Sequence, residues 1–283
     1  MRYLILGING MAGHVIGTYL MEKGHDIIGL AKQESKICDT IICDVCDKEK
    51  FKKTLESCSY DVVINCIGVL NKFVDMNLAD GIYVNSYLPH YTAQLIANKN
   101  VKLIHISTDC VFEGTKGAYK ESDIPDSTSY YGRSKALGEV IDDRNLTLRT
   151  SIIGPEIKRN GIGLYDWFMK QNGQVSGYTR AIWSGVTTIQ LAHAIEQDIL
   201  LNQKGLYHLS NNDNISKYNL LKLMNEYCRN DKILINKYDD FVNDKSIVNT
   251  NSVKYDVPSY EQMLKEMGEW IREHKELYPM YNV

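Results

Sequence analysis

Short apolar segments alternate with amphipathic helical stretches through the first 150 residues. Runs such as residues 62–66 and 102–106 are almost wholly apolar, which is typical of parallel strands that helices cover on both faces. The segments that predict strands are residues 3–6, 26–30, 40–43, 62–66, 102–106 and 147–149. The stretches that predict helices lie between them, at residues 12–23, 48–57, 78–98 and 129–142. This alternation predicts an α/β fold built on a doubly wound parallel sheet.

The pattern changes after residue 150, where turn signals such as Gly154-Pro155 and Asn172-Gly173 become frequent. The helices expected here are residues 164–171, 187–201, 216–228 and 259–275, and the short strands are residues 206–209 and 233–235. We therefore expect a main domain of residues 1–150 and a smaller lobe formed mainly by residues 151–283. A segment near residues 187–209 is expected to return to the main domain.

Composition narrows the classes of partner and compartment. A net charge of −3 provides no basic surface for nucleic acid, and no apolar run reaches the roughly 18 residues that a membrane span needs. The apolar N-terminus is too short and too interrupted by glycine for a signal peptide, so we expect a cytoplasmic protein. The seven cysteines include Cys58 and show no paired framework, and Cys43 and Cys46 lack a second ligand pair, so free thiols and no metal site are expected.

A glycine turn joins the first strand to the first helix. Gly7, Gly10 and Gly13 follow the pattern Gly-x-x-Gly-x-x-Gly at the place where a dinucleotide pyrophosphate would bind the helix N-terminus. The alternative is a tight turn with a purely structural role. On the dinucleotide hypothesis, the cofactor contacts in this turn are Gly7, Asn9, Gly10, Met11, Ala12 and Gly13.

The strand ends that follow suggest which dinucleotide binds. The second strand ends near Lys32 and has no acidic residue at its tip, which favours the 2′-phosphate of NADPH, with NADH as the alternative. Lys32 could otherwise be a solvated surface lysine. Asp44 is expected to accept a hydrogen bond from the adenine amino group, and Val45 to pack on the ring. Further expected contacts are Cys66, Ile67 and Gly68 beside the ribose, and Asn85, for which a packing role is equally open.

Candidate catalytic chemistry lies at residues 107–135. Tyr131 and Lys135 are four residues apart, which places both on one helical face, and an ammonium should lower the phenol pKa from its usual value of about 10. The Ser107-Thr108-Asp109 run ends a strand and can place a hydroxyl beside that phenol. Hydroxyl, phenol and ammonium together predict proton delivery to a ketone that a hydride source reduces.

These motifs, taken together, resemble an extended short-chain dehydrogenase/reductase. The resemblance rests on the glycine turn, on Ile-Ser-Thr-Asp-x-Val-Phe-x-Gly from residue 106, and on Tyr-Gly-x-Ser-Lys-x-x-Gly-Glu from residue 131. More narrowly, the chain resembles the dTDP-4-dehydrorhamnose reductase group, most strongly over residues 1–15 and 101–155. The resemblance implies a Rossmann-type dinucleotide-binding domain and a C-terminal substrate-binding lobe.

The resemblance also implies an activity and a role for each catalytic residue. The expected reaction is NAD(P)H-dependent reduction of the C4 ketone of a nucleotide-diphospho-4-keto-6-deoxy sugar, in surface polysaccharide biosynthesis. Tyr131 would donate the proton to the keto oxygen, and Lys135 would lower the Tyr131 pKa and bind the nicotinamide ribose. Thr108 would hold the substrate oxygen, beside Ser107, Asp109 and Cys110. A homodimer is a further expectation, although no segment identifies its interface.

The chain departs from that group in several places. Cys110 stands where the group commonly has tyrosine, and residues 69–80 do not match its alanine-rich loop. Residues 177–188 replace a Gly-x-Pro-Thr segment, and within them Arg180 and Trp183 are candidates to bind a diphosphate and to stack on a base or sugar. Trp183 could instead anchor the loop in the core. Arg149 could reach a phosphate or form a structural ion pair. These departures leave the sugar and the base (dTDP, UDP or GDP) open.

Two other classes of function stay open at this point. An NAD-retaining 4-epimerase or 4,6-dehydratase could use the same scaffold, and Asp109 would be the acidic residue that a dehydratase needs. A non-catalytic regulatory subunit is the third hypothesis, because one relative of this family is a partner of methionine adenosyltransferase. Cofactor exchange separates the first two, since a reductase releases its cofactor at each turnover.

Overall fold

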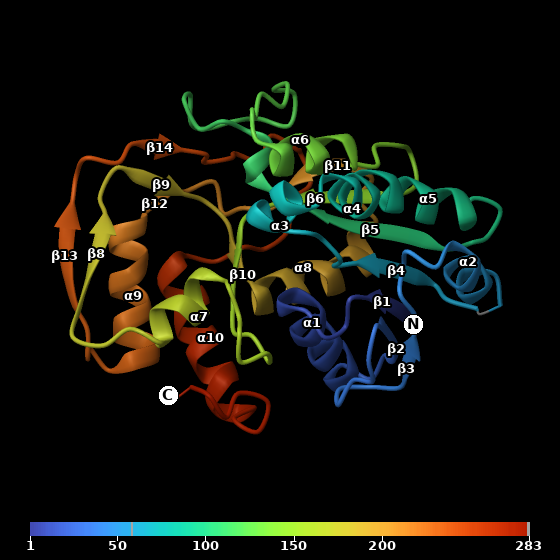
Figure 1. The fold of residues 1–283 in the computed structure, drawn as a ribbon, viewed down its shortest axis with the longest axis horizontal. Coiled ribbons are helices and arrows are strands. Elements are labelled where there is room, and N and C mark those ends of the chain that lie inside the picture. The colour runs from blue at the N-terminus through green and yellow to red at the C-terminus, as the bar shows by residue number, and fades with distance from the viewer. Residues whose placement is uncertain (58, 282–283) are drawn as a thin grey trace.

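A parallel sheet of seven strands forms the centre of the main domain (Figure 1). The computed structural model describes residues 1–57 and 59–281. The strand order is β11-β6-β5-β4-β1-β2-β3, as in a doubly wound fold, which confirms the predicted fold class. The strands are β1 (Arg2–Leu6), β2 (Asp26–Ala31), β3 (Thr40–Ile42), β4 (Val62–Asn65), β5 (Lys102–Ser107), β6 (Leu146–Arg149) and β11 (Gly205–His208).

The register of the central strands brings three functional segments to one edge of the sheet. Leu6 of β1 lies beside Asn65 of β4, and Asn65 lies beside His105 of β5. The glycine turn, residues 66–68 and the Ser-Thr-Asp run therefore all begin where neighbouring parallel strands end. Ligands of such sheets bind at this carboxyl edge.

Helices cover both faces of the sheet, which explains why its strands are nearly all apolar (Figure 1). On one face lie α1 (Met11–Glu22) and α8 (Thr188–Leu201), and on the other lie α2 (Lys48–Ser57), α5 (Leu88–Leu95) and α6 (Tyr130–Leu137). Each face has its own core cluster, since Ile5 packs with the α1 side and Leu4 with the α2 side.

The single helix expected at residues 78–98 is interrupted. The chain forms α4 (Leu78–Ile82), a π-helical turn η1 (Tyr83–Tyr87) and then α5, with a short helix α3 (Asn71–Met76) before them. Pro89 explains the interruption, because it has no N–H to donate to the carbonyl of Asn85 four residues earlier. Because residue 89 gives this carbonyl no hydrogen bond, another segment can come close to it, and π-turns of this kind often occur at functional sites.

The helix that comes close is α6, which is shorter than the helix expected at residues 129–142. Ser129 caps its first turn by accepting a hydrogen bond from the Gly132 amide at 3.0 Å. The helix ends at Leu137, because Gly138 lies against η1: a Cβ at this position would be 1.8 Å from the Asn85 carbonyl oxygen. No side chain fits there.

The C-terminal lobe combines helices with very short strands. Its helices are α7 (Leu164–Met169), α9 (Lys217–Arg229) and α10 (Tyr260–Glu273). Its strands are β7 (Ile152–Ile153), β8 (Gln174–Tyr178), β9 (Ala181–Trp183), β10 (Val186–Thr187), β12 (Ile215–Ser216), β13 (Leu234–Tyr238) and β14 (Asn243–Asp244). Most of these strands lack an alternating pattern long enough to be predicted. The chain returns to the main sheet through α8 and β11, where the returning segment is expected.

Two general expectations can be compared with the described residues. The six cysteines in this part of the chain are free thiols, whereas Cys58 lies outside the described residues. None of the helices within residues 1–57 and 59–281 has the length and apolar character required to cross a bilayer.

The contact between Gly138 and η1 generates a stability prediction. Gly138→Ala should lower the free energy of unfolding by about 2 kcal/mol or more, because the new methyl group meets backbone that cannot move aside. Gly24→Ala is the control: Gly24 has a φ of +80° and open space around it, so only backbone strain of about 1 kcal/mol is expected. Denaturant unfolding of both variants measures the difference. Equal losses would show that the close approach is unimportant.

Candidate active site

The glycine turn has the geometry of a phosphate-binding loop. Gly7 adopts a φ of +83°, and a Cβ on Gly13 would lie 2.3 Å from the Gly7 carbonyl oxygen, so α1 is pressed directly on the turn. The helix starts at Met11, and the backbone amides of its first turn have no carbonyl of a preceding turn to bind. The side chain of Asn9 makes contacts within the protein. Its Nδ2 donates to the carbonyls of Gln33 and Glu34, in the loop after β2, at 3.2 Å each.

Lys32 and Asp44, which we expected to contact different parts of the cofactor, contact each other. Their side chains form an ion pair of 2.8 Å at the ends of β2 and β3. The hydrogen bond between them raises the pKa of Lys32 and lowers the pKa of Asp44. Both side chains are largely exposed, so the pair contributes little to stability and can rearrange around a ligand. Val45, expected on the adenine ring, is instead buried in the core and only 4% exposed.

Asn85 stabilises the loop that follows β4. Its Oδ1 accepts from the Val69 amide at 2.8 Å, and its Nδ2 donates to the Val69 carbonyl at 2.9 Å and to Ser134 Oγ at 3.1 Å. Because the side chain is fully buried and makes these bonds, Asn85 has the packing role that the sequence left open. It fixes the loop of Cys66, Ile67 and Gly68 relative to α6. A Cβ on Gly7 would lie 2.9 Å from Ile67, so this loop also borders the glycine turn.

Thr108 and Tyr131 meet at the end of β5. Thr108 Oγ1 accepts from the Cys110 amide at 3.1 Å and donates to Asp109 Oδ1 at 3.1 Å, which orients its hydroxyl. Gly132 presses the first turn of α6 onto this segment, since a Cβ there would lie 2.2 Å from the Cys110 carbonyl oxygen. The strand end and the helix start are therefore held together by close backbone packing.

The pKa of Tyr131 does not fall as the sequence analysis expects. Burial raises the pKa of Tyr131, the neighbouring Cys110 adds to the rise, and hydrogen bonding to Thr108 opposes it. The expectation was wrong because the Lys135 ammonium is directed elsewhere: Nζ donates to the Ile106 carbonyl at 2.8 Å. Tyr131 is consequently a neutral phenol that carries its proton, the form that a proton donor needs. Burial also lowers the pKa of Lys135, to about 8.

Arg149 forms the structural ion pair that the sequence left open. Its guanidinium donates twice to Glu139, at 2.8 Å from Nε and 2.5 Å from NH2, and NH1 lies 3.0 Å from His208 Nε2. With 1% of Arg149 exposed, its expected contact with a substrate phosphate is not supported. The Ser107 hydroxyl also donates to Glu139 Oε1, at 2.7 Å. This bond ties the end of β5 to the ion pair.

The two candidate substrate-binding residues of the C-terminal lobe, Trp183 and Arg180, lie in different environments. Trp183 is buried, its indole Nε1 donates to Ser151 Oγ at 2.8 Å, and its ring packs on Tyr260, so it anchors the loop in the core. Arg180 is exposed in the turn between β8 and β9. Of the two, only Arg180 has an exposed side chain.

Several residues of the site carry no role in the sequence analysis. Glu139 is part of the Tyr-Gly-x-Ser-Lys-x-x-Gly-Glu motif, and its position there is a signal that could have found it. His105 and Asn65 lie in apolar strands, where a lone buried polar side chain needs a partner. Asn65 Nδ2 lies 3.2 Å from His105 Nδ1, and His105 Nε2 lies 3.4 Å from Lys135 Nζ.

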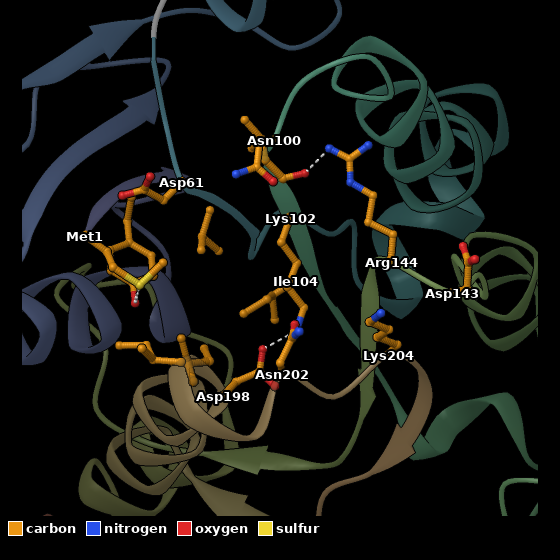
Figure 2. A pocket seen from close by; sticks show the side chains of 15 residues that line it. Met1, Asp61, Asn100, Lys102, Ile104, Asp143, Arg144, Asp198, Asn202 and Lys204 are labelled. Carbon is orange, nitrogen blue, oxygen red and sulfur yellow. Dashed lines mark hydrogen bonds and ion pairs between the residues drawn. The ribbon is translucent and has the colours of Figure 1, made fainter.

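A pocket of about 340 Å³ lies elsewhere, at the amino ends of the strands (Figure 2). Figure 2 shows Met1, Lys102 and Asn202 around it. Lys102 Nζ is paired with Asp198 Oδ2 at 2.5 Å and with the Gln203 carbonyl at 2.6 Å, so its charge is used within the protein. The pocket is on the opposite edge of the sheet from the site.

The comparisons with known proteins agree with this geometry. The RmlD substrate binding domain family model matches residues 1–243. A probable low-salt glycan biosynthesis reductase, Agl14, of Haloferax volcanii is 34% identical over 161 residues, which cover 54% of this chain and 54% of that protein. A dTDP-4-dehydrorhamnose reductase of Aggregatibacter actinomycetemcomitans is 29% identical over 157 residues, 53% of this chain and 51% of that protein. The chain thus spans about half the length of these two relatives.

Among solved structures, the dTDP-4-dehydrorhamnose reductase of Bacillus anthracis in complex with NADP superposes with a TM-score of 0.80. The alignment covers 94% of this chain and 98% of that one at 22% identity, so it shows a shared fold. The match of the family model over most of the chain, together with the glycine turn and the Thr108, Tyr131 and Lys135 group at one sheet edge, shows that the chain belongs to the RmlD substrate binding domain family.

Proposed function

We propose that the protein reduces the C4 ketone of a nucleotide-diphospho-4-keto-6-deoxy sugar with NADPH. The observation that carries this proposal is the placement of Thr108, Tyr131 and Lys135 at the carboxyl edge of the sheet, next to the glycine turn. The reductases named among the relatives support the same reaction class. NADPH supplies the hydride, and the protein supplies orientation and the proton.

The proton would come from Tyr131. Burial keeps its phenol neutral. The Thr108 hydroxyl, which donates to Asp109 in this structure, would turn its proton toward the substrate, so that both hydroxyls bind one keto oxygen. As negative charge develops on that oxygen, a donor held in a water-poor site stabilises the transition state and transfers its proton. Lys135 lies one turn further along α6 and would bind the nicotinamide ribose.

The cofactor residues fit a dinucleotide. A Cβ at Gly13 would fill the space that the Gly7 carbonyl occupies, and the amides of α1 are available for a pyrophosphate. Lys32 would release Asp44 to bind the 2′-phosphate, leaving the Asp44 carboxylate for the adenine amino group. Asp109 Oδ1 accepts a hydrogen bond from the Thr108 hydroxyl and would hold that residue at the end of β5.

Removing the phenol hydroxyl tests the catalytic assignment. Tyr131→Phe should lower kcat by about two orders of magnitude or more while NADPH still binds, because only the proton donor is lost. Steady-state rates on a panel of dTDP-, UDP- and GDP-linked 4-keto sugars measure the effect. Tyr218→Phe is the matched control, since Tyr218 also precedes a lysine by four residues but lies on α9 in the lobe. A near-normal rate for Tyr131→Phe would refute the role.

Cofactor preference tests the Lys32 assignment. Lys32→Ala should raise the Kd of NADPH by about tenfold, the equivalent of ~1.4 kcal/mol, and leave the Kd of NADH nearly unchanged. The unpaired Asp44 would add repulsion toward the 2′-phosphate. Fluorescence titration of both cofactors measures the ratio, and Lys36→Ala, an exposed lysine of the same loop, is the control.

If Lys32→Ala weakens both cofactors equally, Lys32 does not read the 2′-phosphate. A tightly retained NAD⁺ in the purified protein would contradict the reductase and favour the epimerase or dehydratase.

We also propose that the protein forms a homodimer through α4 and α6. A groove of about 490 Å³ between these helices is lined by the exposed apolar side chains of Leu78, Ile82, Tyr130 and Leu137. Leu137→Lys should therefore give a monomer in sedimentation velocity, because a charge would be buried in an apolar contact. Leu200→Lys, on the exposed end of α8, should leave the mass unchanged. An unaltered mass for Leu137→Lys would place the interface elsewhere.

A further inference from the structure

Lys135 has a polar neighbour whose hydrogen-bonding role can be worked out from its own contacts. His105 lies on β5, is completely buried, and presents Nε2 to Lys135 Nζ at 3.4 Å. The other ring nitrogen, Nδ1, is 3.2 Å from Nδ2 of Asn65, its register partner on β4. Lys135 also donates to the Ile106 carbonyl at 2.8 Å. The ammonium therefore has one clear acceptor and one neighbour whose character depends on the ring proton.

The position of that proton follows from the next bond in the chain. The backbone amide of Ile67 donates to Asn65 Oδ1 at 3.1 Å, which determines that the amide oxygen of Asn65 faces Ile67. The amide nitrogen then faces His105 and can only donate, so Nδ1 must accept. Burial keeps the imidazole neutral, since it holds the pKa of His105 well below its usual value. A neutral ring that accepts at Nδ1 carries its proton on Nε2, pointing at Lys135.

This arrangement distinguishes the two forms of Lys135. A neutral amine can accept the Nε2–H bond, whereas an ammonium places donor against donor. Moving the ring proton to Nδ1 would oppose it to the Asn65 amide nitrogen, and turning that amide would oppose its nitrogen to the Ile67 N–H. Each arrangement with a charged Lys135 therefore loses one buried hydrogen bond, and such losses are costly.

Other charged or titratable groups near Lys135 do not remove this bias. Glu139, two residues after α6, and Cys66 after β4 favour the ammonium, but burial outweighs them. The Glu139 carboxylate is already bound by Arg149 and Ser107. Tyr131 on the same helix is a neutral phenol. His105 is the group in direct contact with Nζ.

We propose that His105 is a positioning residue that favours the neutral form of Lys135, through a ring tautomer that Asn65 and the Ile67 amide determine. Its consequence for catalysis rests on the proposed function. If Lys135 must be charged to bind the ribose and assist Tyr131, loss of its proton sets the decline of activity at alkaline pH. Asn65 and His105 would then adjust the upper limit of the working pH range.

The ring tautomer is tested directly in the unmodified protein. Long-range ¹H–¹⁵N NMR spectra distinguish the protonated from the unprotonated ring nitrogen of His105, whose signal is identified by its loss in His105→Phe. We expect the proton on Nε2 at neutral pH. A proton on Nδ1 would overturn the inference, and this experiment needs no variant to be active.

A double-mutant cycle tests the effect on Lys135. Asn65→Asp keeps an oxygen for the Ile67 amide and presents a second one to His105, which moves the ring proton to Nδ1 and turns Nε2 into an acceptor. The Lys135 titration midpoint should rise by about one pH unit or more, because one buried hydrogen bond is regained in the charged form. NMR of ¹³Cε-labelled lysine measures the midpoint, and the Lys135 signal is the one absent in Lys135→Met.

The same change made in a His105→Phe background is the control for the added charge. If Asn65 affects Lys135 through the His105 ring, Asn65→Asp should shift the Lys135 titration midpoint clearly less when residue 105 is phenylalanine. Equal shifts in both backgrounds would mean that the charge acts through space, and the inference would be wrong. Circular dichroism and thermal unfolding establish that each variant is folded.

These measurements use the protein without cofactor or sugar, so they separate this inference from the proposed function. A shifted Lys135 midpoint in a protein that reduces none of the 4-keto sugars would support the role of His105 and refute the proposed reductase function. If the protein is an active reductase but Asn65→Asp leaves its Lys135 midpoint unchanged, only the proposed role of His105 is refuted. In an active enzyme, the alkaline limb of the kcat–pH profile should move with the NMR midpoint.

Discussion

The close approach of α6 to η1 is the contact on which the site depends. Pro89 leaves the Asn85 carbonyl without its helical partner, and Gly138 lets the end of α6 lie directly against it. From this position the Asn85 side chain reaches both the loop after β4 and Ser134 of α6. One contact therefore fixes α6 relative to the segment expected beside the cofactor ribose. A wider separation would leave Tyr131 and Lys135 on the correct helix but away from the strand ends.

Burial, more than pairwise attraction, determines the pKa values of Tyr131 and Lys135. It raises the pKa of Tyr131 and lowers the pKa of Lys135, so each residue is biased toward its neutral form. Below these residues lies the buried Glu139–Arg149 ion pair, where two strong bonds compensate for removal from water. The structure thus separates a supporting ionic layer from a largely neutral reactive layer. Cofactor binding would bring new charge into the reactive layer and shift these balances.

The features that could be predicted from the sequence are those that depend on residues close together in the chain. The strands of the sheet are short, apolar and bounded by turns, and all six that were expected before residue 150 are present with small differences at their ends. The glycine spacing and the Tyr131–Lys135 pair likewise depend on residues close in the chain. The interrupted helix at residues 78–98 shows the limit, since Pro89 was visible but the approach of Gly138 was not.

The amino-acid sequence by itself determined the doubly wound fold, the tight glycine turn and the family, because periodicity, glycine positions and short motifs act within a few residues. Only the tertiary structure decided the roles of side chains that meet across strands. Arg149 could have faced phosphate or Glu139, Trp183 could have faced substrate or core, and Lys135 could have faced the phenol or His105. Each outcome depends on which distant partner is within about 3 Å, the distance at which hydrogen bonds form. That information lies in the packing of separate elements and not in any one segment.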